Sequence, residues 1–283
     1  MKNIRLVGVP EHFNLPWQMC IANNDFTNAG IQLNWKDIPE GTGKMCQMLR
    51  NNETDLAVIL TEGIVKDILN GNPSKLVQVY VESPLIWGIH VAAHSKYTSI
   101  SDLEGKKAAI SRYGSGSELM TYVHANEHGW AKESIPFEVV HTIDGAVKAL
   151  TNETADYFMW EHFMTKPLVD SGIFRRLGDC LTPWPSFVIA ATKDFCENNP
   201  DAIATILTII NAKTRSFKSI PTIDTILASK FNLKKEDAQN WLSLTSWSQK
   251  TISEIEINNI QNKLVEYQII TKKGTYSELV AAL

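Results

Sequence analysis

Five short polar clusters contain the residue types that could do chemistry in this sequence, and each directly follows an apolar segment. They occupy residues 11–14, 41–43, 61–63, 111–117 and 160–162. Together they offer carboxylates, hydroxyls, amides, glycine backbone and aromatic rings, the groups that bind a compact polar solute. No GxSxG elbow is present, and no Cys stands in a recognisable nucleophile context. The clusters therefore favour binding over catalysis.

The candidate ligand contacts lie within these clusters, except Trp17, which follows the first one; they are polar or aromatic side chains, with one glycine whose backbone allows close approach. They are His12, Asn14, Trp17, Thr42, Gly43, Thr61, Glu62, Ser111, Arg112, Ser115, Ser117, Trp160 and Glu161. Glu62 or Glu161 can accept a hydrogen bond from an amine or a ring N–H, and Arg112 can pair with an anion or a carboxylate. The hydroxyls can equally cap helices, and the indoles can equally pack in a core.

Three other readings of the sequence are weaker. The loop at residues 111–117 has neither the GxxxxGK[ST] nor the GxGxxG pattern of nucleotide-binding loops. The stretch HANEH (residues 124–128) matches HxxEH and would place His124 and His128 on one helix face, but no third metal ligand can be identified. The four cysteines are scattered and are interpreted as buried thiols. We therefore predict no metal, no cofactor and no catalytic residue.

Composition limits the class of protein. The chain has 283 residues, of which 44% are hydrophobic and 20% charged, and its net charge is −4. These values are typical of a globular protein of one or two domains, and they argue against a nucleic-acid partner. No apolar segment is long enough to span a bilayer. The first ten residues lack the pattern of a secretory signal, which predicts a cytoplasmic protein, or a periplasmic one if a leader has been removed.

Strand-like and helix-like segments alternate along the chain, which predicts an α/β protein with mainly parallel sheets. The expected strands cover residues 4–9, 31–38, 54–60, 75–81, 85–93, 106–110, 137–142, 155–160, 174–179 and 185–192. We expect a helix from Pro16 to Ala29 capped by Asn14, and another capped by Ser117. Ligands bind outside the carboxyl ends of strands in such sheets, so the polar clusters should face a shared cleft.

The segments GVPEHFNLPW, EGTGKMCQMLRNNETDLAVILTEGIV, SISDLEGKKAAISRYGSGSEL and AVKALTNETADYFMWE carry a resemblance over nearly the whole chain. The sequence resembles the type II periplasmic-binding-protein-like family, in particular its nitrate/sulfonate/taurine-binding and thiamine-pyrimidine-precursor branch. The cysteine-rich CCCF motif of the branch that synthesises the thiamine pyrimidine is absent.

This resemblance implies a two-lobed fold in which each lobe is a mixed, mainly parallel sheet flanked by helices. Residues 1–92 and 186–283 would form lobe I, with a helical C-terminal part, and residues 93–185 lobe II. The implied function is a monomeric substrate-binding component for thiamine pyrimidine precursors, sulfonates or nitrate, with the ligand in the interlobe cleft. An ABC permease would be the partner of an exported form. The alternative is a cytoplasmic enzyme of the same fold that acts on a related small heterocycle.

Overall fold

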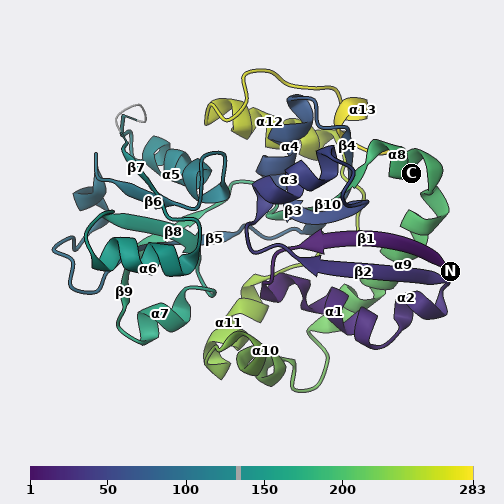
Figure 1. The fold of residues 1–283 in the computed structure, drawn as a ribbon, viewed down its shortest axis with the longest axis horizontal. Coiled ribbons are helices and arrows are strands. Elements are labelled where there is room, and N and C mark those ends of the chain that lie inside the picture. Colours follow the sequence, from purple (N-terminus) through teal and green to yellow (C-terminus); the bar gives the residue numbers. More distant parts are fainter. Residues whose placement is uncertain (132–134, 283) are drawn as a thin grey trace. The chain divides into compact units, whose positions relative to one another are not determined.

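The chain divides into two compact units, each built on one five-stranded sheet (Figure 1). The computed structural model describes residues 1–131 and 135–282. Unit 1 consists of Met1–Ser83 and Trp184–Leu283, and unit 2 of Pro84–Pro183. Each unit is described by itself below.

The sheet of unit 1 has the strand order β2-β1-β3-β10-β4. Its strands are β1 (Lys2–Gly8), β2 (Ile31–Asp37), β3 (Leu56–Leu60), β4 (Ser74–Val81) and β10 (Phe187–Thr192). β1 is parallel to β2 and β3, whereas β10 is antiparallel to both β3 and β4. The carboxyl ends of β1 to β4 therefore lie at one edge of the sheet together with the start of β10. We call this the carboxyl edge of unit 1.

Helices cover the sheet of unit 1 on both faces (Figure 1). They are η1 (His12–Asn14), α1 (Leu15–Ala22), α2 (Asp25–Asn28), α3 (Thr42–Arg50), α4 (Thr61–Leu69), α8 (Lys193–Asn198), α9 (Pro200–Phe217), α10 (Ile223–Phe231), α11 (Lys235–Leu244), α12 (Glu254–Glu266) and α13 (Tyr276–Leu279). Every residue of the central strands β3 and β10 is buried. Continuous apolar strands of this kind are expected where helices cover both faces of a sheet.

The first helical region differs from the single helix expected over residues 16–29. It consists of η1, α1 and α2, with a break at Asn23 and Asn24. Asn24 has φ 60°, a left-handed conformation that cannot continue a helix and that asparagine adopts more readily than most residues. Asn14 does precede α1, but its side chain makes no capping hydrogen bond. Its Nδ2 donates instead to the carbonyl oxygen of Val9, at 2.8 Å.

The sheet of unit 2 has the strand order β7-β6-β8-β5-β9. Its strands are β5 (Ile86–Ala92), β6 (Ala108–Ile110), β7 (Phe137–Val139), β8 (Tyr157–Glu161) and β9 (Phe174–Leu181). β6 is parallel to β7 and β8, and β5 is antiparallel to β8 and β9. The carboxyl ends of β6, β7, β8 and β9 thus share one edge with the start of β5. We call this the carboxyl edge of unit 2.

β5 lies in unit 2, whereas the family resemblance implied that residues 1–92 belong to lobe I. The reason is its pairing: β5 lies between β8 and β9 in the sheet of unit 2 and pairs with both in the antiparallel direction. The helices of unit 2 are η2 (Ile100–Leu103), α5 (Gly116–Glu127), α6 (Ile143–Thr151) and α7 (Lys166–Asp170).

The predicted fold class is confirmed, since two mixed sheets flanked by helices match a two-lobed fold. The C-terminal part, from α8 onward, is helical as expected. Across the described residues, no helix combines the length and apolar character needed to cross a membrane.

Candidate functional site

Glu62 is the buried acid at the carboxyl edge of unit 1. It lies in the first turn of α4, directly after β3, and its exposed fraction is 1%. Oε2 of Glu62 accepts a hydrogen bond from Nε1 of Trp184 at 2.7 Å. Oε1 is also buried, and it has no hydrogen-bond partner among the residues that the structure describes. A buried oxygen of this kind is costly unless a ligand or water bonds to it.

Burial also changes the protonation of Glu62. It raises the pKa of the carboxyl from 4.5 to about 7, because the charged form loses its hydration. Hydrogen bonds from the backbone and from Trp184 partly oppose this rise. Near neutral pH the carboxyl is therefore divided between its neutral and charged forms. In either form an oxygen can accept from an N–H, and the charged form can also pair with a cationic amine.

The segment before β10 brings Trp184 to Glu62. Thr61 fixes this segment: its Oγ1 donates to the carbonyl oxygen of Pro185 at 2.6 Å, and its N–H donates to that of Ser186 at 3.1 Å. The hydroxyl of Thr61 thus bonds to the backbone at the carboxyl edge and holds the segment before β10 in place. Trp184 is not among the contacts predicted from the sequence. Only the antiparallel placement of β10 next to β3 shows that it belongs here.

Thr42 lies against the same turn of α4. A Cβ added to Gly63 would stand 2.3 Å from Cγ2 of Thr42, so the two helices approach closely only because residue 63 is glycine. α3 begins at Thr42 after Gly41, whose φ of 75° favours glycine, and no side chain caps this helix. The structure therefore brings Thr42, Gly43 and Glu62 to neighbouring helix starts at one edge.

His12 is fully buried in an aromatic cluster of unit 1. Its ring stacks on Trp241 with centroids 4.5 Å apart, and the rings of Phe13 and Phe231 lie at 4.9 and 5.5 Å. Burial lowers the pKa of His12 to about 3, so the imidazole is neutral at physiological pH. This arrangement positions η1 against α10 and α11. Contact between His12 and a ligand stays a prediction.

Asn14 and Trp17 are also fully buried. Oδ1 of Asn14 has no hydrogen-bond partner among the described residues, so this amide resembles Glu62 in offering a buried acceptor. Trp17 packs between Phe26 and Trp35, with ring centroids at 6.0 and 6.3 Å. These contacts hold α1 on the sheet. Nε1 of Trp17 likewise has no hydrogen-bond partner among the described residues, and ligand contact of Asn14 and Trp17 stays a prediction.

The serine-rich loop of unit 2 is organised by its own hydroxyls. Ser115, rather than the expected Ser117, caps α5: its Oγ accepts from the N–H of Glu118 at 3.3 Å. Oγ of Ser117 accepts from the N–H of Ser111 at 3.0 Å and lies 3.0 Å from Oγ of Ser115. The expectation for Ser117 was wrong because the helix begins two residues earlier, at Gly116. All three hydroxyls are buried and shape the loop beside half-buried Arg112.

Glu161 and Trp160 lie at the carboxyl edge of unit 2 but face opposite sides of its sheet, as neighbours on a strand do. Glu161 is buried, and its Oε2 accepts from the N–H of Met164 at 2.6 Å. Trp160 is half-buried and stacks on Phe158 at 5.3 Å. Its Nε1 has no hydrogen-bond partner among the described residues. The indole therefore has a donor to offer, whereas Glu161 helps to shape the turn after β8.

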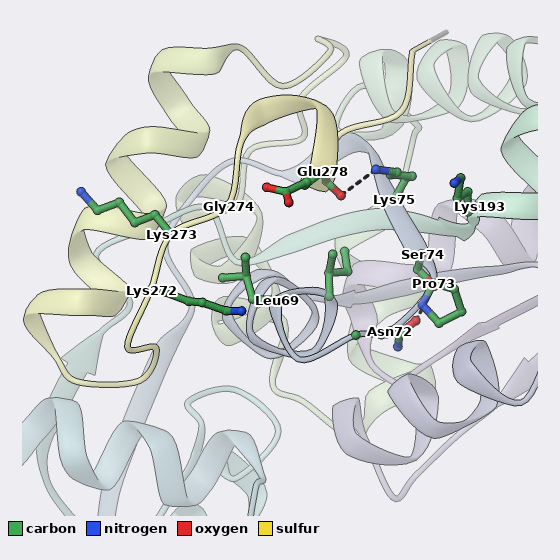
Figure 2. A pocket seen from close by; sticks show the side chains of 12 residues that line it. Leu69, Asn72, Pro73, Ser74, Lys75, Lys193, Lys272, Lys273, Gly274 and Glu278 are labelled. Carbon is green, nitrogen blue, oxygen red and sulfur yellow. Dashed lines mark hydrogen bonds between the residues drawn. The ribbon is translucent and has the colours of Figure 1, made fainter.

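A cavity of about 290 Å³ lies elsewhere in unit 1, at the amino end of β4 (Figure 2). Its lining includes four lysines, Lys75, Lys193, Lys272 and Lys273. Nζ of Lys75 donates to the carbonyl oxygens of Ser277 and Glu278, at 2.5 and 2.7 Å. The N–H of Ala281 donates to the carbonyl oxygen of Leu76. These hydrogen bonds attach the C-terminal segment to β4, so the cavity lies where the two meet. That is the end of β4 away from Glu62.

These two sheets and their helices form the two-lobed fold of periplasmic binding proteins. The model of the family described as Ca3427-like PBP matches residues 87–180, which lie in unit 2. No curated protein sequence matches the chain significantly.

Solved structures agree over nearly the whole chain. The CA3427 gene product of Candida albicans, which defines a new family with the generic periplasmic binding protein fold, is 23% identical. The similarity covers 97% of this chain and 92% of that one, with a TM-score of 0.88. The alkanesulfonate-binding protein SsuA of Xanthomonas axonopodis pv. citri, bound to MOPS, is 15% identical over 100% and 97% of the two chains, with a TM-score of 0.81. The periplasmic aliphatic sulphonate binding protein SsuA of Escherichia coli is 15% identical over 99% and 92%, with a TM-score of 0.70. At these identities the likeness establishes the fold.

Proposed function

We propose that this protein binds a small molecule through the carboxyl edge of unit 1, with Glu62 as its principal polar contact. The observation that carries the proposal is Oε1 of Glu62, a buried carboxylate oxygen with no hydrogen-bond partner among the described residues. It lies at the strand ends where open α/β sheets bind ligands. The fold, shared with proteins named for sulfonate binding, supports the same conclusion.

The proposed ligand presents an N–H or amine group to Glu62. An acid whose pKa is about 7 can accept from a ring N–H or an exocyclic amine without carrying a full buried charge. An anion without any N–H, such as nitrate, would be repelled by the charged form of Glu62 and could be bound only by the O–H of the neutral form. Aminopyrimidines of the thiamine-precursor type and amino-sulfonates are therefore favoured among the ligands that the family resemblance implies.

Unit 2 would contribute an anion-binding surface to the same function. The loop at residues 111–117 has small residues, and Arg112 is half-buried beside them. Backbone N–H groups at the start of α5 and a guanidinium suit a sulfonate or carboxylate. For an exported form, the proposed partner is an ABC permease.

The experiment is a paired binding measurement by calorimetry. Taurine and an aminopyrimidine carry the amine, whereas an alkanesulfonate and nitrate lack it. We expect the wild-type protein to bind an amine-bearing ligand at one per chain and Glu62→Gln to bind it at least about 10-fold more weakly. In the variant, the single side-chain oxygen accepts from Trp184, so its NH₂ faces the ligand's own donor. Glu82→Gln, an exposed change in the same unit, is the control.

The same samples distinguish a binding protein from an enzyme of this fold. After prolonged incubation with substoichiometric protein, the ligand should be recovered unchanged by mass spectrometry. Progressive loss of the ligand would indicate that this protein is an enzyme instead.

A further inference from the structure

Three side chains of unit 2 bring a nitrogen, an oxygen and a sulfur together. His124 and Glu127 lie one turn apart on α5, and Cys180 lies on β9. One potential ligand atom from each residue lies within 4.8 Å of the other two. Sγ of Cys180 stands 3.6 Å from Oε2 of Glu127. We call His124, Glu127 and Cys180 the donor cluster.

The structure changes the interpretation of the HxxEH stretch. From the sequence, His124 and His128 are the paired residues and no third ligand can be named. In the fold, the exposed His128 still lies beside His124, with ring centroids 4.4 Å apart, and its ring stacks on Trp130 at 5.2 Å. The sheet supplies Cys180 as the third potential ligand, from a strand more than fifty residues further along the chain. Two elements that are distant in sequence thus contribute to one cluster.

A second observation points to a ligand for this cluster. His124 is 2% exposed, and its Nε2 is buried with no hydrogen-bond partner among the described residues. Cys180 is 3% exposed, whereas Glu127 lies at the surface. His124 and Cys180 are therefore the buried members of the cluster, and the carboxylate of Glu127 connects it to solvent. This arrangement gives a cation a route of entry.

We propose that the donor cluster binds Zn²⁺ or a similar borderline-soft divalent cation. Imidazole nitrogen, thiolate sulfur and carboxylate oxygen are the ligands that Zn²⁺ takes in proteins, whereas Ca²⁺ and Mg²⁺ require oxygen donors. The thiol of Cys180, which donates to Glu127 in this structure, would release its proton to solvent when the cation binds. Three protein ligands leave a position open for water or another molecule.

The geometry needs only a small adjustment. Ligand atoms around a tetrahedral Zn²⁺ lie about 3.3–3.8 Å apart, from bond lengths of about 2.0–2.3 Å. Cys180 and Glu127 are already at this separation. Any other separation in the cluster, which is at most 4.8 Å, must close by no more than about 1 Å.

Cobalt titration of the EDTA-treated full chain tests the proposal. Co²⁺ bound to a thiolate gives a charge-transfer absorption band in the near ultraviolet. We expect this band to saturate at one Co²⁺ per chain and to disappear when Zn²⁺ is added. Cys180→Ala should abolish it, whereas Cys196→Ala, which removes another buried thiol from α8 of unit 1, should leave it unchanged.

Glu127→Gln provides a test at an exposed position where folding is not at risk. It should weaken Co²⁺ binding at least about 10-fold, because even outer-shell partners of metal ligands contribute that much. Absence of the band in the wild-type protein, its persistence in Cys180→Ala, or unchanged affinity in Glu127→Gln would each overturn the proposal.

Discussion

Replacing Glu62 by glutamine should change the pH dependence of stability by a predictable amount. The folded-state pKa of Glu62 is raised from 4.5 to about 7, so the folded protein holds its proton more tightly than the unfolded chain does. The stability that this proton provides is fully present below about pH 4.5 and is lost as the pH rises through 7. The difference of about 2.5 pH units corresponds to about 3 kcal/mol at 1.36 kcal/mol per unit. Glutamine is neutral throughout and avoids this loss.

The prediction concerns the gap in unfolding free energy between Glu62→Gln and wild type. Burial of the charge should cost less than about 1 kcal/mol at pH 5 and more than about 3 kcal/mol at pH 9, so the gap should shift in favour of the variant by about 2–3 kcal/mol. Urea denaturation at the two pH values measures it.

Other buried groups cancel in this comparison. Burial also raises the pKa of Glu11 to about 7, but Glu11 is present in both proteins. Glu82→Gln removes an exposed charge and should change stability by no more than about 0.5 kcal/mol at either pH. A gap for Glu62→Gln that is the same at pH 5 and pH 9 would refute the assignment of Glu62 as a desolvated acid.

Three further substitutions test the local structure by urea denaturation. Gly63→Ala should lower the unfolding free energy by about 1–3 kcal/mol, because its methyl group meets Cγ2 of Thr42. Adding Thr42→Ser, which removes that methyl group, should restore most of this loss. Losses in the double variant that simply add would contradict the contact between residues 42 and 63. Ser115→Ala should lower the unfolding free energy by about 1 kcal/mol through loss of the α5 cap, and an unchanged midpoint would show that the cap contributes nothing. Trp184→Phe removes the donor to Glu62 and should lower it by at least about 1 kcal/mol while raising the pKa of that carboxyl further; a stability equal to wild type would count against the bond.

The strands could be predicted from local pattern because apolar segments of strand length are bounded by turn residues. The segment LAVIL of β3, for example, is apolar throughout, and the structure buries all of it. Long-range pairing could not be predicted in the same way. Residues 86–92 read as a strand in either lobe, and only their antiparallel partners assign them to unit 2. The break at Asn24 was missed because an Asn-Asn pair inside a helical pattern is a weak signal beside Gly30.

In the candidate site, too, local pattern was informative whereas long-range contacts could not be predicted. Glu62 follows from the rule that ligands bind at strand ends, so the sequence alone could nominate it. Its partner Trp184 lies 122 residues away, and no local pattern connects the two. In the sequence, His12 lies in one polar cluster with Asn14 and Trp17 follows it, yet His12 and Trp17 both pack against aromatic rings in unit 1. Residue type cannot distinguish an aromatic side chain that meets a ligand from one that fills a core.

Calorimetric titration of taurine or an aminopyrimidine into wild-type protein, Glu62→Gln and Glu82→Gln tests the central claim most directly. The account predicts saturable binding of one amine-bearing ligand per chain to wild type and Glu82→Gln, with affinity at least about 10-fold weaker in Glu62→Gln. Equal affinity in all three proteins would contradict the role assigned to Glu62, and so would equal binding of ligands with and without the amine.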